Sequence, residues 1–167
     1  FKKTKSKNLC MAGGVALNCS MNGKIEQSRI FDEIYIQPAS ADDGCAIGAC
    51  YLANHKENEN QFTSKTNYNS YLGSRFTDDE IEFQLKELNL NYSKSENIFK
   101  ETAEQLNRGK IIGWFQGATE FGPRALGNRS ILCKPYPAEM KDHLNNQVKF
   151  RENFRPFAPA VLSEYQN

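Results

Sequence analysis

The sequence GWFQGATEFGPRALGNRSIL at residues 113–132 joins an apolar run to a glycine-rich loop. The run at 111–115 predicts a buried strand, because strands covered on both faces are continuously apolar. Four residues in the loop constrain its backbone: Gly117, Gly122, Pro123 and Gly127. Arg124 and Arg129 lie inside this loop. Since the planar fork of arginine matches phosphate or carboxylate two bonds at a time, the stretch predicts a pocket for a small planar or phosphorylated anion.

A second basic stretch, NNQVKFRENFRPFAPAVL, follows at 145–162. It adds Lys149, Arg151 and Arg155, the last of which precedes Pro156. Arginines in loops are also often solvated or paired with a carboxylate. Three glutamates could serve as such partners: Glu120, Glu152 and Glu164. The residues alone leave an anion site and a structural role both open.

Composition is typical of a globular chain, with 167 residues, 39% hydrophobic and 25% charged. This length fits one domain or pieces of two. A net charge of +1 predicts no bulk attraction to nucleic acid or to an anionic membrane. The five cysteines have no C-x-x-C spacing, and no apolar run is long enough to cross a bilayer, so a cytoplasmic location is expected. Because the chain starts without methionine, we expect a fragment.

The amino-terminal part predicts a strand, a glycine turn and a helix. NLCMAGG at 8–14 is the strand ending in Gly13 and Gly14, and residues 16–29 form the helix, with Leu17, Met21 and Ile25 on one face. A helix start after a glycine turn can bind phosphate, although a glycine pair can also be a simple turn. A second strand at 33–37 leads through PASADDG at 38–44 into a helix at 45–55. Asp42 or Asp43 is the expected cap of that helix.

The polar residues 55–70 are expected to form a linker between a first domain at 1–54 and a second at 71–167. Thr77 and Glu80 form a capping box ahead of a helix with Ile81, Leu85 and Leu88 on one face. The later elements are expected in this order: a strand at 90–93, a helix at 97–107 closed by Gly109, strands at 110–116 and 129–133, and a helix at 138–148. This alternation predicts an α/β or α+β fold without deciding between them.

Both basic stretches closely resemble the carboxy-terminal part of the NodU/CmcH family of O-carbamoyltransferases, whose members carbamoylate nodulation factors, cephalosporins and aminoglycosides. The matching residues are FQG at 115–117, EFGPRALGNRSI at 120–131, Asn145, Lys149, Arg151, Glu152 and RPFAP at 155–159. GGVALN at 13–18 and PxSxDDGxAxGA at 38–49 resemble the end of the family's amino-terminal domain. The resemblance implies the end of an actin/hexokinase-like nucleotide-binding domain. An incomplete mixed-sheet domain similar to threonylcarbamoyl-AMP synthases would follow it.

The resemblance also implies a reaction in two steps. Carbamoyl phosphate and ATP would give carbamoyl adenylate, which a hydroxyl of a sugar or antibiotic-like acceptor then attacks. Arg124 and Arg155 would grip carbamoyl phosphate during catalysis. Three further residues would bind the nucleotide phosphates or form structural pairs: Arg129, Lys149 and Arg151. The nucleotide of the amino-terminal domain would contact Gly13, Gly14 and Asn18.

In the same comparison, Asp42 is a ligand of iron or another divalent metal. The family's two metal-binding histidines are absent from this sequence, so Asp42 alone cannot form the site and the isolated chain is expected to be inactive in the full reaction. Two other functions remain open. One is threonylcarbamoyl-type tRNA modification or hydrogenase maturation, and the other is a noncatalytic anion-binding module. The sequence does not decide the acceptor or the oligomeric state.

Overall fold

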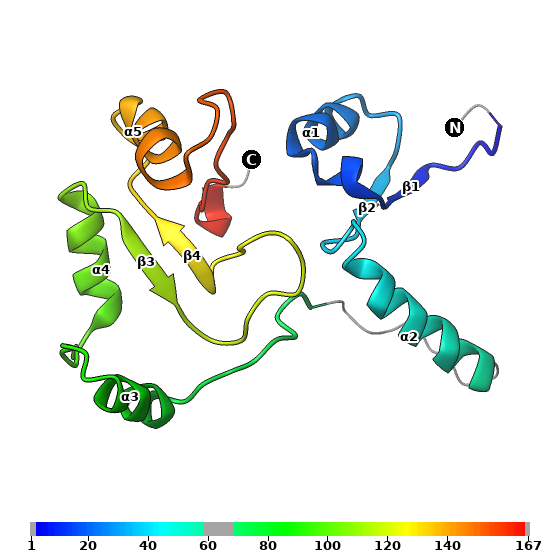
Figure 1. Ribbon diagram of the computed structural model, residues 1–167. Helices are drawn as coiled ribbons and strands as arrows, with labels where there is room; N and C mark the ends of the chain where they lie inside the picture. The colour runs from blue at the N-terminus through cyan, green and yellow to red at the C-terminus, as the bar shows by residue number, and fades with distance from the viewer. Residues whose placement is uncertain (1–2, 59–68, 166–167) are drawn as a thin grey trace. The chain divides into compact units, whose positions relative to one another are not determined.

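The computed structural model describes residues 3–58 and 69–165 (Figure 1). The chain divides into two units. The first comprises Phe1–Ile81 and Gln116–Arg129, and the second comprises Glu82–Phe115 and Ser130–Asn167. The glycine-rich loop at 116–129 therefore groups with the amino-terminal residues. The domain boundary expected within 55–70 stays a prediction, because 59–68 lie outside the described residues.

A parallel strand pair joined by a helix begins the first unit. Strand β1 (Asn8–Met11) pairs in register with β2 (Glu33–Ile36), and α1 (Cys19–Gln27) connects them. The predicted helix at 16–29 starts later than expected, because η1 (Gly14–Leu17) is a separate 3-10 turn. Asn18 is extended (φ −79°, ψ 92°), and its side-chain oxygen accepts the Met21 N–H at 3.0 Å. A new helix therefore begins after Asn18, which is its N-cap.

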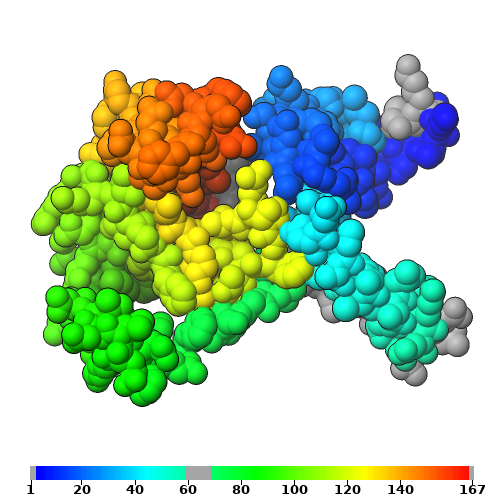
Figure 2. Space-filling view, in the orientation of Figure 1, coloured from blue at the N-terminus to red at the C-terminus, as the bar shows by residue number. Residues whose placement is uncertain are grey.

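Helix α2 (Gly44–Glu57) follows the PASADDG segment, as the sequence predicts. Asp43 is at the N-cap position, but its side chain makes no capping hydrogen bond. A Cβ at Gly44 would collide with the carbonyl oxygen of Ala39, so only glycine fits the first turn. The helix continues through residues 55–57, which were expected to belong to the linker. The helix lies at the surface on the face that Figure 2 shows, and none of its residues is buried.

The buried residues of the first unit are all small: Ala16, Ala39, Ser40 and Ala118. Ala118 comes from the glycine-rich loop, whereas Ala39 and Ser40 come from the PASADDG segment. A Cβ at Gly122 would lie 3.4 Å from the Pro38 carbonyl oxygen. The loop and this segment thus meet through a close approach of their backbones. Among the described residues of the first unit, no large side chain is buried.

Capping residues in the sequence fix where the next two helices begin. At the start of α3 (Asp78–Glu87), the Thr77 N–H donates to Glu80 Oε2 at 2.8 Å, and the Glu80 N–H donates to Thr77 Oγ1 at 3.3 Å. The predicted capping box is therefore confirmed. Asn97 caps α4 (Ile98–Asn107) by accepting the Lys100 N–H at 3.0 Å. The remaining elements are β3 (Ile112–Phe115), β4 (Arg129–Leu132), α5 (Glu139–His143), η2 (Leu144–Lys149) and η3 (Ser163–Tyr165).

Strands β3 and β4 pair as a two-stranded sheet and confirm the strands expected on either side of the loop. Half-buried and exposed residues alternate along β3, and Phe115 is one of the exposed residues. The strand that was expected to be buried is therefore only partly covered. One other prediction was wrong: the expected strand at 90–93 does not form, and the Tyr92 hydroxyl donates to Glu82 at 2.9 Å instead. The helix expected at 138–148 forms, and it changes at Leu144 from an α-helix into a π-helix.

The described residues thus mix helices with two small sheets. The actin/hexokinase-like and threonylcarbamoyl-AMP-synthase-like folds stay predictions. Among residues 3–58 and 69–165, no helix has the length and apolar character that a bilayer span requires.

Candidate functional site

The glycine-rich loop, residues 116–129, is closed at its base by a backbone bond from Gln116 N–H to the Asn128 carbonyl at 3.0 Å. Three of its glycines have positive φ: Gly117 (51°), Gly122 (128°) and Gly127 (105°). Other residues rarely adopt this conformation, so the glycines are needed for the turns. The backbone turns predicted from these glycines are therefore confirmed.

Glu120 organises the middle of the glycine-rich loop. Its Oε1 accepts the backbone N–H groups of Leu126 (2.7 Å), Asn128 (2.8 Å) and Arg129 (3.3 Å). Burial of the carboxylate acts to raise its pKa. The backbone N–H groups of these residues, together with its own, outweigh burial and hold the pKa of Glu120 below its ordinary value of 4.5. The sequence analysis considered Glu120 as a partner for an arginine side chain. In the structure its carboxylate instead binds backbone N–H groups of the loop.

Arg129 fixes the base of the same loop through its guanidinium group. Its guanidinium donates to the carbonyl oxygens of Gln116 (2.6 Å), Gly117 (3.1 Å) and Asn128 (3.0 Å). A longer bond of 3.5 Å reaches the Ser74 carbonyl. Of the two roles that the sequence left open for Arg129, this geometry supports the structural one.

Residues 70–74 run beside the glycine-rich loop and bond to its backbone. The N–H of Gly73 donates to the Thr119 carbonyl at 2.9 Å, and the N–H of Thr119 donates to the Ser74 carbonyl at 3.0 Å. The Tyr71 hydroxyl donates to the Leu126 carbonyl at 2.9 Å. A Cβ at Gly73 would lie 2.7 Å from the Thr119 Cβ, so glycine is required here. Sequence reasoning missed this support, and Gly73 was its only local signal.

Arg124 lies in the same loop but has a different environment. Its side chain is exposed and makes no hydrogen bond or ion pair with any residue that the structure describes. The loop therefore holds one arginine in structural bonds and presents another to solvent. This is the arrangement that an anion site needs, because an available guanidinium stands on a fixed backbone.

The second loop, residues 145–157, is organised by a buried amide. Asn145 has no exposed surface, and its Nδ2 donates to the Arg155 carbonyl at 3.3 Å and to the Asn153 carbonyl at 3.5 Å. Its Oδ1 accepts Nε of Arg151 at 2.7 Å. Arg151 also donates to the Pro156 carbonyl at 3.3 Å, and its guanidinium lies 4.6 Å from the centre of the Phe157 ring. Arg151 is thus held in structural contacts.

Arg155 is the exposed arginine of the second loop. Its Nε lies 3.8 Å from Glu152 Oε2, and the two side chains are 53% and 64% exposed. Water screens so open a pair, so it is a weak restraint. Lys149 is exposed and makes no hydrogen bond or ion pair with the described residues. Arg124 and Arg155 belong to different units, and their convergence on one anion stays a prediction.

The residues expected to contact a nucleotide lie at the turn after β1. Gly13 has a φ of 94°, and its N–H donates to the Ser40 carbonyl at 2.5 Å. A Cβ at Gly13 or Gly14 would meet nothing within 4 Å, so both glycines face open space. The Asn18 side-chain oxygen is already engaged as the α1 cap. Nucleotide binding at these residues stays a prediction.

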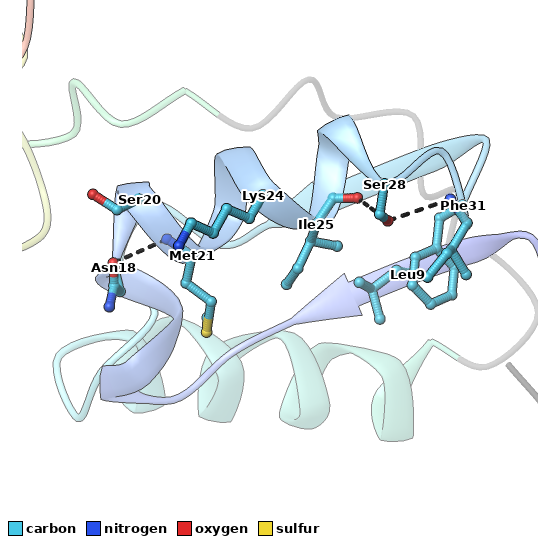
Figure 3. A pocket seen from close by; sticks show the side chains of 9 residues that line it. Leu9, Asn18, Ser20, Met21, Lys24, Ile25, Ser28 and Phe31 are labelled. Atoms are coloured by element: carbon cyan, nitrogen blue, oxygen red, sulfur yellow. Dashed lines mark hydrogen bonds between the residues drawn. The ribbon is translucent and has the colours of Figure 1, made fainter.

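A cavity of about 550 Å³ lies between β1 and α1 (Figure 3). Leu9 lines it from the strand, Met21 and Ile25 from the helix, and Phe31 from the segment that follows α1. Figure 3 shows Met21 and Ile25 on the same side of α1, as the helical spacing predicts. The cavity is mainly apolar, but Asn18 and Lys24 also line it, whereas Gly13 and Asp42 do not.

Two family models match the chain. The model described as Carbamoyltransferase N-terminus matches residues 1–51, and Carbamoyltransferase C-terminus matches residues 103–167. The chain belongs to the carbamoyltransferase family. The resemblance that the sequence motifs carried is thereby confirmed. The two arginine-bearing loops lie in the carboxy-terminal match, and the glycine pair, Asn18 and Asp42 lie in the amino-terminal match.

Relatives of the chain include Nodulation protein NolO of Bradyrhizobium diazoefficiens, 44% identical over 98% of the chain and 30% of the relative. Nodulation protein U of Rhizobium fredii is 37% identical over 95% of the chain and 26% of its own length. An uncharacterized protein of Synechocystis sp. is 46% identical over 98% of the chain and 28% of its length. The chain thus spans about three tenths of the length of these relatives.

The metal site implied for the carbamoyltransferase family is not formed by the described residues alone. Residues 3–58 and 69–165 contain no group of three His, Cys, Asp or Glu side chains that could hold an ion. Asp42 is exposed and could supply a single carboxylate. Both carboxylate oxygens of the neighbouring Asp43 are buried and have no hydrogen-bond partner among the described residues. The same is true of Ser40 Oγ. A metal at Asp42 stays a prediction.

Proposed function

We propose that the whole protein is an O-carbamoyltransferase in which the two arginine-bearing loops bind carbamoyl phosphate. Water releases phosphate from carbamoyl phosphate, and an oxygen of the resulting carbamate attacks the α-phosphate of ATP, which gives carbamoyl adenylate with pyrophosphate as the leaving group. A hydroxyl of a sugar or antibiotic-like acceptor then loses its proton and attacks the carbamoyl carbon, with AMP as the leaving group. Negative charge develops on phosphate and leaving-group oxygens in both steps. Fixed cations are therefore the groups that this chemistry requires.

The observation that carries the proposal is the contrast between Arg124 and Arg129. Arg129 donates to backbone carbonyls and so fixes the loop, whereas Arg124 is exposed and has no partner among the described residues. Pro123 precedes Arg124 and restricts the backbone next to it. A guanidinium on a fixed backbone loses little conformational freedom when it binds an anion, which favours tight binding.

The test is calorimetric titration of the full-length protein with carbamoyl phosphate. A charge-assisted hydrogen bond contributes roughly 1.5–3 kcal/mol, so Arg124→Ala should weaken binding about tenfold to a hundredfold. Arg124→Lys should restore binding only in part, because it keeps the charge and loses the fork. Arg108→Ala removes an exposed arginine outside both loops and is the matched control.

Two results would overturn the proposal. One is carbamoyl phosphate binding by folded Arg124→Ala that equals the wild type. The other is a loss in Arg108→Ala as large as that in Arg124→Ala, since the effect would then follow from net charge and not from the loop.

A further inference from the structure

Glu120 encloses Arg124 within a closed turn. Its carboxylate accepts the N–H of Leu126, six residues further along the chain, so Arg124 lies on the span between the two bonded residues. The same oxygen, Oε1, also accepts the N–H groups of Asn128 and Arg129. One side-chain atom thereby fixes three backbone positions that follow Arg124.

The residues before Arg124 are fixed by other contacts. The N–H of Phe121 donates to the Ser70 carbonyl at 2.6 Å, and Gly122 lies against the backbone of Pro38 and Ala39. The ring of Pro123, directly before Arg124, then fixes the φ of Pro123 itself. Arg124 is thus held on its amino-terminal side by backbone packing and on its carboxy-terminal side by Glu120.

Arg129 cannot replace Glu120 in this role, because its guanidinium bonds lie at the base of the loop. They reach Gln116, Gly117 and Asn128, and none of them falls on residues 121–127. Without the Glu120 carboxylate, the N–H of Leu126 would lose its side-chain acceptor, although the Tyr71 hydroxyl would still hold the Leu126 carbonyl and Gln116 Nε2 the Gly127 carbonyl. Arg124 would then sample more orientations, and binding would carry the entropy loss of ordering it.

We propose that Glu120 is a positioning residue for carbamoyl phosphate, acting through the conformation it imposes on the backbone that carries Arg124. This inference rests on the proposed function. Glu120 itself need not touch the substrate, because its bonded oxygen faces the loop backbone.

The choice of substitutions separates positioning from a catalytic use of the charge. All three bonds go to Oε1, and glutamine keeps an oxygen at that distance, so Glu120→Gln should bind carbamoyl phosphate within about threefold of the wild type. Aspartate keeps the charge but is one methylene shorter and cannot reach all three N–H groups. Glu120→Asp and Glu120→Ala should each bind about tenfold more weakly. A catalytic carboxylate would give the reverse order, with aspartate more active than glutamine.

A double-mutant cycle tests whether Glu120 acts through Arg124. Calorimetry with carbamoyl phosphate is applied to full-length wild type, Glu120→Ala, Arg124→Ala and the double variant. If Glu120 only aims Arg124, its removal should cause no further loss once Arg124 is gone. The affinity for ATP should stay within about twofold in all four proteins, whereas a general loss of folding would lower it as well.

The outcomes are distinct. If Arg124→Ala binds carbamoyl phosphate normally, the proposed function fails and this inference fails with it. If Arg124→Ala is weakened while Glu120→Ala binds normally, or if the two losses multiply, only the positioning role is overturned. Glutamine weaker than aspartate at position 120 also overturns it.

Discussion

The two arginine-bearing loops reach a similar result by different means. In each loop one arginine, Arg129 or Arg151, donates to backbone carbonyls, and another, Arg124 or Arg155, is exposed beside a proline. An ionised carboxylate accepts backbone N–H groups in the first loop, whereas a fully buried neutral amide donates to backbone carbonyls in the second. The comparison shows that arginine content does not reveal which guanidinium is available. Which guanidinium is available depends on which side chains form hydrogen bonds with the backbone of each loop.

The largest effect should come from the organiser of the second loop. Asn145→Ala removes an acceptor for the charged Arg151 and donors to two carbonyls, so it should destabilise the protein by about 2–4 kcal/mol. Asn146→Ala, at the exposed neighbouring position, should have an effect near zero. Urea unfolding of both full-length variants measures the difference. Equal stabilities would mean that the buried amide does not organise this loop.

Acid should loosen the backbone of the first loop and leave the Asn145 bonds of the second in place. The folded pKa of Glu120 lies below its ordinary value of 4.5, so its contribution is complete above that value and is lost as pH falls through the lower folded pKa. Asn145 does not titrate. In NMR spectra, the backbone amide signals of Leu126 and Asn128 should shift on acidification, while the side-chain amide signals of Asn145 should not.

Glu120→Gln is the control for this titration, because it should abolish the shift at Leu126. Amide signals of both loops that move together, or that stay constant until the whole protein unfolds, would contradict the difference between the two organisers.

The smallest effect should come from the ion pair beside Arg155. Glu152→Gln removes the weak contact at 3.8 Å, so stability should change by less than about 1 kcal/mol. If Arg155 binds the anion, losing this competitor should tighten carbamoyl phosphate binding, by no more than about fivefold. Glu139→Gln, which removes an exposed carboxylate outside the loop, is the charge-matched control. Weaker binding in Glu152→Gln than in Glu139→Gln would assign Arg155 a purely structural role.

Short-range signals in the sequence predicted much of the fold. The capping box at Thr77 and the helix end at Gly109, which has a positive φ, depend on residues within a few positions of one another, and both are confirmed. The same holds for the glycines of the first loop. The family match rests on the motifs of both loops and is confirmed as well.

Features that depend on contacts between distant residues were not predictable. Nothing near Arg129 shows that its fork will meet the Ser74 carbonyl, 55 residues away. Residues 90–93 have strand-like composition, yet a strand needs a partner and none pairs with them among the described residues. Local spacing likewise could not show that Glu120 would bond backbone N–H groups and not a guanidinium.

The opposite charges of Glu120 and Arg129 have an electrostatic consequence for the first loop. Residues 116–129 contain one glutamate and two arginines, so these two fixing groups cancel and the loop carries the single net charge of Arg124. At physiological salt the field of one exposed charge is screened over about 8 Å. The loop alone should therefore attract anions only at short range, and capture should depend on the fit of the guanidinium fork more than on long-range steering.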